Sequence, residues 1–311
     1  MRRLIGAQRP AHIGTMKRVF FIVGPTAVGK SEIAAEVAQR LGAKVLSADA
    51  FQIYRGLDLL TAKAESATLA KAPHHLIGAF SLSEEMNAEK FRATAEQIIA
   101  RGKPTIVVGG TGLYVKALTH GLAKLPAANQ RLREKLERTT SEELFRSFRA
   151  LDPIGAEKID SQNRRRLIRA VEVCLLTGKP FSEQRTEWSE SAPENGVLLE
   201  RERPDLYARI NQRVEEMFAA GVVEEVRAAK DIGPTAEKAL GLREIRSLIA
   251  GEISRTECIA QIQHLTRRYA KRQLTWFRRQ TNFPSLNLSA HDPAEAVEII
   301  SQSASRVFLR G

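Results

Sequence analysis

The sequence is poor in cysteine and in long apolar runs, and each shortage excludes a class of protein. The 311 residues include only Cys174 and Cys258, which lie far apart and match no metal-ligand spacing. This excludes a disulfide framework and a zinc module, and it fits the reducing cytoplasm. No apolar run approaches the roughly 20 residues that cross a bilayer, and residues 1–16 lack the apolar core of a signal peptide. We therefore expect a cytoplasmic protein without a membrane partner, preceded by a flexible tail over residues 1–16.

Acidic residues are also in short supply. The chain has 36 acidic side chains against 48 lysines and arginines, and its formal net charge is +12. Such an excess favours a large polyanion as a partner, although a merely basic surface is the alternative. The hydrophobic fraction of 43% is that of a globular protein. The 311 residues are enough for one large domain or for a domain that has a second lobe.

A phosphate-binding loop pattern, G-x-x-x-x-G-K-[ST], stands near the start of the chain. It comprises Gly24, Pro25, Thr26, Ala27, Val28, Gly29, Lys30 and Ser31. An apolar strand is predicted before it at 17–23, and apolar residues recur at helical spacing after it up to Gly42. In this context the backbone N–H groups and the helix N-terminus point at one anion. Lys30 adds a positive charge, and the Ser31 hydroxyl is placed for a magnesium ion.

The alternation of strands and helices predicts an α/β fold with a parallel sheet. Further strands are predicted at 43–48, 75–80, 104–108 and 196–202, and helices at 88–101, 204–219, 256–280 and 293–306. Residues 125–191 lack strand patterns and are polar and rich in arginine, which predicts an inserted helical lobe. The catalytic core then comprises residues 17–124 and 192–311.

Two polar residues follow predicted strands and become candidates for chemistry. Asp49 ends the second strand, and Thr111 lies in a Gly-Gly-Thr-Gly turn after the strand at 104–108. Ligands of open α/β sheets bind at the carboxyl ends of the strands. From position alone, Asp49 is either a turn-former or a functional acid, and Thr111 either caps the next helix or faces the ligand.

Two basic segments are candidates for contacts with a phosphate backbone. Residues 163–169 place Arg165, Arg166 and Arg169 on one side of a predicted helix. Residues 266–280 contain six basic residues and no acidic one, and a helix there is expected to bury Trp276 and Phe277 while its cations face outward. The alternative for both segments is an ordinary solvated face.

The order of several motifs resembles the tRNA dimethylallyltransferase family, also called the IPP transferase family. The similar stretches are the phosphate loop, 49–54, 61–63, 73–77, 108–114 and 267–273, and the resemblance runs from about 17 to 283. It implies a P-loop NTPase-like core with an inserted lobe that binds tRNA. The implied reaction moves a dimethylallyl group from dimethylallyl diphosphate to N6 of the adenosine 3′ of the anticodon. Residues 24–31 would then bind the diphosphate that leaves, with Mg²⁺ held on Ser31.

The resemblance also implies roles for individual residues. Asp49 is the general base, and Lys30 and Thr111 complete the catalytic set. The implied tRNA contacts near the base are Asp49, Ala50, Phe51, Gln52 and Thr111. Those in the lobe are Arg133, Arg165, Arg166, Leu167, Ile168 and Arg169. Those toward the C-terminus are Lys238, Ala239, Leu240, Gly241, Leu242, Arg243, Lys271, Arg272, Gln273, Leu274, Thr275, Trp276, Phe277 and Arg278. Spacing leaves open which of Arg203, Arg209 and Arg213 faces the diphosphate.

The chain departs from the usual family pattern at Ala50, Leu60, Ala64, Gly78 and Leu242. The family usually has serine, glycine, proline, aspartate and tyrosine there, so a hydroxyl beside Asp49 and a tyrosine near the RNA surface are lost. These changes bear on rate and substrate preference. Two other functions remain open, namely prenyl transfer to free adenine nucleotides and a P-loop kinase or ATP-dependent RNA-binding module. We expect the protein to act as a monomer.

Overall fold

The computed structural model describes residues 18–123, 125–185 and 194–310, and the predicted tail at 1–16 lies outside them. The chain divides into two compact units. The large unit contains residues 1–119 and 191–311, and the small unit contains residues 120–190. The sequence predicts the lobe at 125–191. Each unit is described by itself below.

The large unit is built on a six-stranded sheet with the order β3-β2-β4-β1-β5-β6. The strands are β1 (Val19–Val23), β2 (Lys44–Ser47), β3 (His74–His75), β4 (Thr105–Gly109), β5 (Gly196–Glu200) and β6 (Ser285–Asn287). Every pairing is parallel. All five residues of β1 are buried, as expected for a strand that helices cover on both faces. The predicted parallel α/β fold is confirmed.

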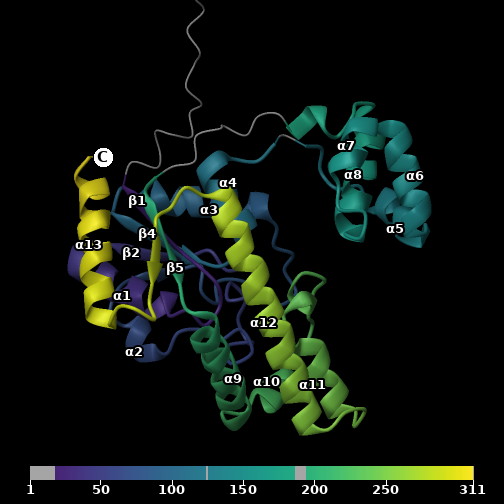
Figure 1. The fold of residues 1–311 in the computed structure, drawn as a ribbon. Coiled ribbons are helices and arrows are strands. Elements are labelled where there is room, and N and C mark those ends of the chain that lie inside the picture. Colours follow the sequence, from purple (N-terminus) through teal and green to yellow (C-terminus); the bar gives the residue numbers. More distant parts are fainter. Residues whose placement is uncertain (1–17, 124, 186–193, 311) are drawn as a thin grey trace, which may run out of the picture. The chain divides into compact units, whose positions relative to one another are not determined.

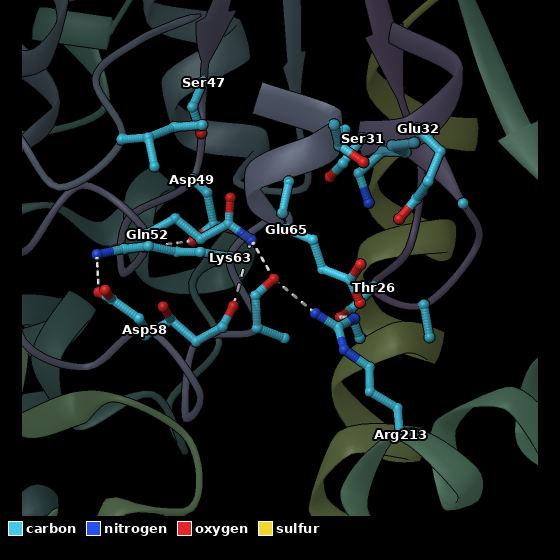
Figure 2. A pocket seen from close by; sticks show the side chains of 18 of the residues that line it. Thr26, Ser31, Glu32, Ser47, Asp49, Gln52, Asp58, Lys63, Glu65 and Arg213 are labelled. Atoms are coloured by element: carbon cyan, nitrogen blue, oxygen red, sulfur yellow. Dashed lines mark hydrogen bonds and ion pairs between the residues drawn. The ribbon is translucent and has the colours of Figure 1, made fainter. Parts of the chain in front are cut away.

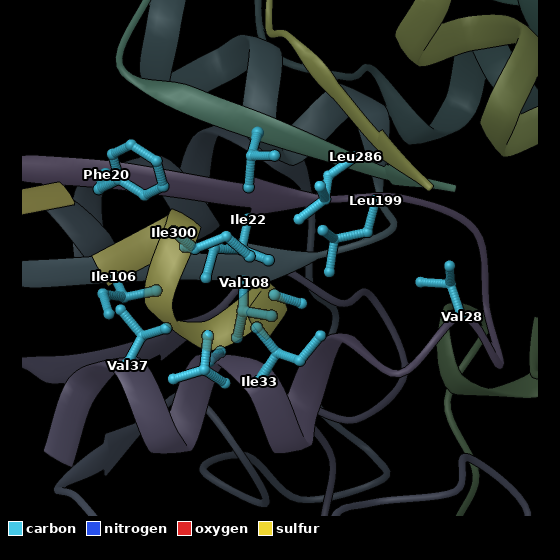
Figure 3. Packing of buried hydrophobic residues seen from close by; sticks show 14 of the residues in the cluster. Phe20, Ile22, Val28, Ile33, Val37, Ile106, Val108, Leu199, Leu286 and Ile300 are labelled. Carbon is cyan, nitrogen blue, oxygen red and sulfur yellow. The ribbon is translucent and has the colours of Figure 1, made fainter. Parts of the chain in front are cut away.

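Successive side chains of β1 enter two different cores, because strand residues alternate between faces. Phe20 and Ile22 pack with α1 (Lys30–Leu41) and α13 (Pro293–Leu309), which Figure 3 shows around Ile33, Val37 and Ile300. Phe21 and its neighbours on the opposite face pack with α3 (Ala88–Ile99) and α4 (Gly112–His120). The sheet is therefore covered on both sides.

A helical layer lies beyond the carboxyl end of β5 (Figure 1). It contains α9 (Arg203–Ala219), α10 (Val222–Ala228), α11 (Leu242–Ile249) and the first half of α12 (Arg255–Gln280). These helices share an apolar core with Leu57 and Leu60, and the second half of α12 returns along the sheet to bury Phe277. The short α2 (Ser66–Leu69) and a 3₁₀ turn at Ala236–Lys238 complete this unit.

The described residues of the small unit form helices joined by loops, with no strand among them. It consists of α5 (Gln130–Arg138), α6 (Ser141–Leu151), α7 (Pro153–Lys158), α8 (Arg164–Thr177) and a 3₁₀ turn at Glu183–Arg185. Its core includes Leu144, Phe148, Leu167 and Val171. Because this core contains only residues of the insertion, the unit has an apolar interior of its own.

One strand prediction was wrong in its extent, and one strand was missed. The strand predicted at 75–80 ends at His75, because Leu76 and Gly78 have φ values of 61° and 57°, which an extended strand does not allow. After this turn the backbone pairs with the segment that follows β2, where the Phe80 amide donates a hydrogen bond to the Ile53 carbonyl. Residues 285–287 form β6, a strand that the sequence analysis missed because only three residues pair at the edge of the sheet.

None of the helices in the described part of the chain has both the length and the apolar character that a bilayer span requires.

Candidate active site

A cavity of about 610 Å³ lies in the large unit where the carboxyl ends of β1, β2 and β4 meet (Figure 2). The phosphate loop, the residues after β2, the segment 58–65 and α9 all line it. Among the lining residues are Thr26, Ala27, Gly29, Lys30, Ser31, Asp49, Gln52, Lys63, Arg209, Arg213 and Gln273. The position agrees with the rule that α/β sheets bind ligands at the carboxyl edge.

The phosphate loop needs its first glycine for space. A Cβ on Gly24 would lie 2.4 Å from the Leu199 carbonyl oxygen, and the φ of Gly24 is +152°. Helix α1 begins at Lys30 without a side-chain cap, so its first amides are available to an anion. The Lys30 Nζ donates to the Pro25 carbonyl at 2.7 Å. Of the predicted loop residues, Gly24, Pro25 and Val28 do not line the cavity.

The cavity holds desolvated positive charge. The pKa of Lys30 is lowered to about 8, chiefly by burial and also by the nearby Arg213, which together outweigh the opposite effects of Asp49 and Glu32. Burial also lowers the pKa of the Arg213 guanidinium. A dianion in this cavity would be attracted by both cations at low effective dielectric. The cavity is therefore suited to an anionic ligand.

The structure distinguishes between the three arginines around α9. Arg213 lines the cavity and donates to the Thr26 hydroxyl at 3.2 Å and to the Ala62 carbonyl at 2.9 Å. Arg209 also lines the cavity and donates to the Ala27 carbonyl at 3.0 Å. Arg203 instead stacks on Tyr207 at 5.1 Å and is not among the lining residues. The sequence analysis missed Arg201, which donates to the Val28 carbonyl at 3.0 Å.

Asp49 forms the turn after β2, which confirms the first of the two alternatives that the sequence left open, and it also lines the cavity, where a functional acid would have to lie. Its Oδ1 accepts hydrogen bonds from the amides of Phe51 at 2.9 Å and Gln52 at 3.2 Å. These bonds fix the carboxylate at the cavity wall. Thr111 accepts the Ala50 amide on its hydroxyl at 3.0 Å, and it does not line the cavity.

The Gly-Gly-Thr-Gly turn is explained by close packing. A Cβ would lie 2.3 Å from the Ala48 carbonyl if built on Gly109, and 2.2 Å from the Gln273 amide nitrogen if built on Gly110. On Gly112 it would lie 2.4 Å from the Trp276 ring. The turn can therefore lie against Ala48, the residue after β2, on one side and against α12 on the other because these positions lack side chains.

The segment 58–65 forms one wall of the cavity and is held at several points. Gln52 donates to the carbonyls of Thr61 at 3.2 Å and Ala62 at 3.0 Å. Glu225 on α10 accepts the amides of Leu59 and Leu60, both at 2.8 Å. The sequence analysis missed Glu225, because nothing in its local pattern distinguishes it from the other acidic residues of its helix. Gln52, predicted to contact RNA, stabilises this wall.

The predicted RNA-contact residues near the C-terminus differ in exposure. On α12, Lys271, Arg272, Thr275 and Arg278 are exposed, Leu274 and Trp276 are partly buried, and Gln273 and Phe277 are buried. In 238–243, Lys238 and Arg243 are exposed, whereas Ala239, Gly241 and Leu242 are buried and Leu240 is partly buried. Arg278 pairs with Glu200, with nitrogen–oxygen distances of 2.9 and 2.7 Å. Five of the six basic residues at 266–280 are therefore exposed, as predicted, whereas Arg267 is partly buried and donates to the Asn211 side chain at 2.6 Å.

In the small unit, a buried carboxylate holds two of the predicted RNA-contact arginines. Glu172 has no exposed side-chain surface and accepts both Nε and Nη2 of Arg133 at 3.0 Å and Nη1 of Arg169 at 2.6 Å. It also accepts the Asn129 amide at 2.8 Å. Arg165 and Arg166 are exposed, whereas Leu167 and Ile168 pack in the core. Two predicted contacts, Leu167 and Ile168, therefore have side chains that point inward.

Replacing Glu172 with glutamine is expected to destabilise the small unit by about 2 kcal/mol, because the two partly exposed arginines lose a buried partner. Burial raises the pKa of Glu172, but hydrogen bonds from Arg133 and Arg169 outweigh it and hold the pKa below its usual value. A lowered carboxylate pKa contributes stability above the unfolded pKa that is lost as pH falls through the folded pKa.

The measurement is hydrogen exchange of the α5 and α8 amides, which should be about 30-fold faster in Glu172→Gln at pH 7, with the difference shrinking at acid pH. The control is Glu157→Gln on α7, an exposed residue. Equal exchange in the two variants would contradict the role of Glu172.

Fold and cavity together define a P-loop protein whose cavity is suited to an anionic ligand and has a carboxylate in its wall. The family model described as IPP transferase matches residues 52–280. The chain therefore belongs to the IPP transferase family, and the resemblance seen in the sequence is confirmed.

Curated relatives are similar over most of their length. The tRNA dimethylallyltransferase 1 of Citrifermentans bemidjiense is 42% identical over 276 residues, which are 85% of this chain and 90% of that protein. The tRNA dimethylallyltransferase of Akkermansia muciniphila is 40% identical over 281 residues, which are 89% of this chain and 96% of that protein.

Solved structures agree with the fold. A tRNA isopentenylpyrophosphate transferase from Bacillus halodurans has a TM-score of 0.68 and 33% identity, covering 94% of this chain and 98% of that one. A eukaryotic dimethylallyltransferase acting on tRNA has a TM-score of 0.76 and 25% identity, covering 94% and 79%. The P-loop NTPase-like fold expected from the resemblance is confirmed.

Proposed function

We propose that the protein transfers a dimethylallyl group from dimethylallyl diphosphate to N6 of the adenosine 3′ of the anticodon in tRNA and releases diphosphate. The observation that carries the proposal is that a phosphate loop with a buried lysine and a fixed carboxylate, Asp49, line the same cavity. A kinase can also use a carboxylate as the base for its acceptor, so it is the family and the names of its members that favour alkyl transfer over phosphate transfer.

At the donor end, the phosphate loop would bind the diphosphate. When the carbon–oxygen bond of the donor breaks, its electron pair stays on the diphosphate, and Lys30, Arg213 and the amides at the start of α1 are placed to stabilise that charge. The Ser31 hydroxyl lines the cavity beside them. Such an oxygen donor suits Mg²⁺, which binds through few protein ligands together with phosphate oxygens. Bound there, the ion would neutralise charge on the leaving group.

At the acceptor end, Asp49 would act as general base. Two backbone amides hold its Oδ1, so the carboxylate keeps one orientation without a second side chain. As the bond from N6 to the dimethylallyl carbon forms, the proton of N6 passes to Asp49. The adenosine must leave the anticodon stack to enter the cavity, and single-stranded loops make this inexpensive.

Binding of the anticodon arm would rest on the exposed cations. These are Arg165 and Arg166 in the small unit and Lys238, Arg243, Lys271, Arg272 and Arg278 in the large unit. Such contacts to phosphates give affinity without sequence preference. We also propose that the enzyme works as a monomer in the cytoplasm.

The test is the mass of the product. Unmodified tRNA incubated with the protein, dimethylallyl diphosphate and Mg²⁺ should gain the mass of one dimethylallyl group on a single adenosine. Competition between tRNA and AMP as acceptors tests transfer to free nucleotides, and incubation with ATP alone tests a kinase. Modification of AMP in preference to tRNA would contradict the proposal and indicate a free-nucleotide prenyltransferase. Phosphate transfer from ATP would contradict it and indicate a kinase.

A further inference from the structure

We propose that Gln273 is a positioning residue of the donor site, which holds the phosphate loop in its anion-binding conformation, and that it does not contact RNA. This inference rests on the proposed function. It differs from the resemblance, which includes Gln273 among the tRNA contacts of α12.

The side chain of Gln273 joins two parts of the cavity wall. Its Oε1 accepts the amide of Thr26 in the phosphate loop at 2.9 Å, and its Nε2 donates to the Gly110 carbonyl at 2.9 Å. Only 6% of the residue is exposed. Gln273 can approach Gly110 this closely because glycine has no side chain. A Cβ at this position would lie only 2.2 Å from Nε2. Gln273 therefore ties the loop after β1 to the turn after β4.

The two bonds demand a carboxamide. One partner is an N–H donor and the other a carbonyl acceptor, and a glutamine is the side chain of this length that both accepts and donates. A glutamate would place a carboxylate oxygen against the Gly110 carbonyl, whereas a methionine would leave the Thr26 amide and the Gly110 carbonyl unsatisfied.

The phosphate loop has a reason to need such support. Ala27 has a φ of +63°, a left-handed conformation that costs a non-glycine residue free energy. Restraints on the loop around Ala27 include the bonds of Gln273 and Arg213 to Thr26, of Arg209 to the Ala27 carbonyl and of Arg201 to the Val28 carbonyl. Loss of the buried Gln273 bond is therefore expected to let the loop relax away from its anion-binding form.

The side chains of α12 that pack toward the cavity lie on a different face of the helix from its exposed cations. Tyr269 lies one turn before Gln273 and hydrogen-bonds to Thr111 and Gln273, and burial raises its pKa above the usual value, so its hydroxyl stays protonated. Trp276 packs on Gly112 from the same face. Lys271, Arg272 and Arg278 are exposed. Residues that are neighbours in the sequence thus face opposite ways on α12.

The experiment compares Gln273→Glu and Gln273→Met with Gln261→Glu, an exposed position on the same helix. Calorimetry with inorganic diphosphate and Mg²⁺ measures the donor site, and filter binding with unmodified tRNA measures the RNA surface. We expect both Gln273 variants to bind diphosphate about tenfold or more weakly. Their tRNA affinity and the behaviour of Gln261→Glu should stay within about twofold of wild type. In turnover, the KM for the donor should rise more than the KM for tRNA.

Two results would overturn the inference. One is unchanged diphosphate affinity in both Gln273 variants, and the other is a loss of tRNA affinity with diphosphate binding intact. Circular dichroism and thermal unfolding establish whether each variant is folded. If Gln273→Glu is not folded, the comparison is made with Gln273→Met alone. If wild type binds diphosphate but does not prenylate tRNA, the proposed function fails while the role of Gln273 in the loop is still measured.

Discussion

Replacing Asp49 with asparagine is expected to lower the rate of prenyl transfer by about 10²–10⁴-fold, the usual contribution of a general base. The asparagine oxygen can still accept the amides of Phe51 and Gln52, so the turn after β2 should be kept. The loss then reports on the proton acceptor and not on the fold. Single-turnover transfer with tRNA saturating is the measurement, and binding of diphosphate should change little.

The control for Asp49→Asn is Asp231→Asn. Asp231 is exposed and has a φ of 52°, which asparagine tolerates well. The rate of prenyl transfer by Asp231→Asn should match that of wild type. A transfer rate in Asp49→Asn close to that of this control would remove Asp49 as the base and reduce it to a turn-former.

Replacing Lys30 with methionine is expected to lower the rate by about 10²–10³-fold, because a charge that stabilises the leaving diphosphate is lost from a desolvated site. Diphosphate affinity should fall as well, since the lysine attracts the ligand before reaction. The matched control is Lys158→Met, an exposed lysine of the small unit. A rate in Lys30→Met equal to that of the control would contradict the role.

The pH dependence of diphosphate binding gives a second test of Lys30. The pKa of Lys30 is lowered to about 8, so the ammonium is present below that pH and is lost as pH rises through it. Diphosphate affinity should therefore fall above pH 8 in wild type, and this part of the decrease should be missing in Lys30→Met. An anion beside the lysine raises its pKa, so binding at pH 8 should take up protons, measurable by calorimetry in buffers of different ionisation enthalpy.

Much of the donor site could be predicted from residues near one another in the chain. The phosphate loop is a contiguous pattern, and the apolar strand before it and the helix after it have clear periodicities. Asp49 could be placed because the carboxyl ends of parallel strands share one edge. The strand at 75–80 was overextended because apolar character does not reveal the left-handed conformation of Leu76.

Which arginines serve the cavity could not be predicted. Arg203, Arg209 and Arg213 share a helix, but only the docking of α9 turns the last two toward the loop. Glu172 likewise became significant only when α8 brought it beside Arg133, because a carboxylate buried in the core of the small unit has no local signature.

The sequence by itself determined the parallel α/β core with its anion-binding loop, the helical insertion and the position of an acidic residue, Asp49, at the end of β2, since periodicity and contiguous motifs are local properties of the chain. Only the tertiary structure decided that the Gln273 side chain contacts the phosphate loop and is not part of the exposed basic face of α12. Its partner Thr26 lies 247 residues away, and the rotation of α12 about its axis, set by packing of Trp276 and Phe277, determines which side chains reach the cavity. Such contacts depend on three-dimensional packing that no local pattern encodes.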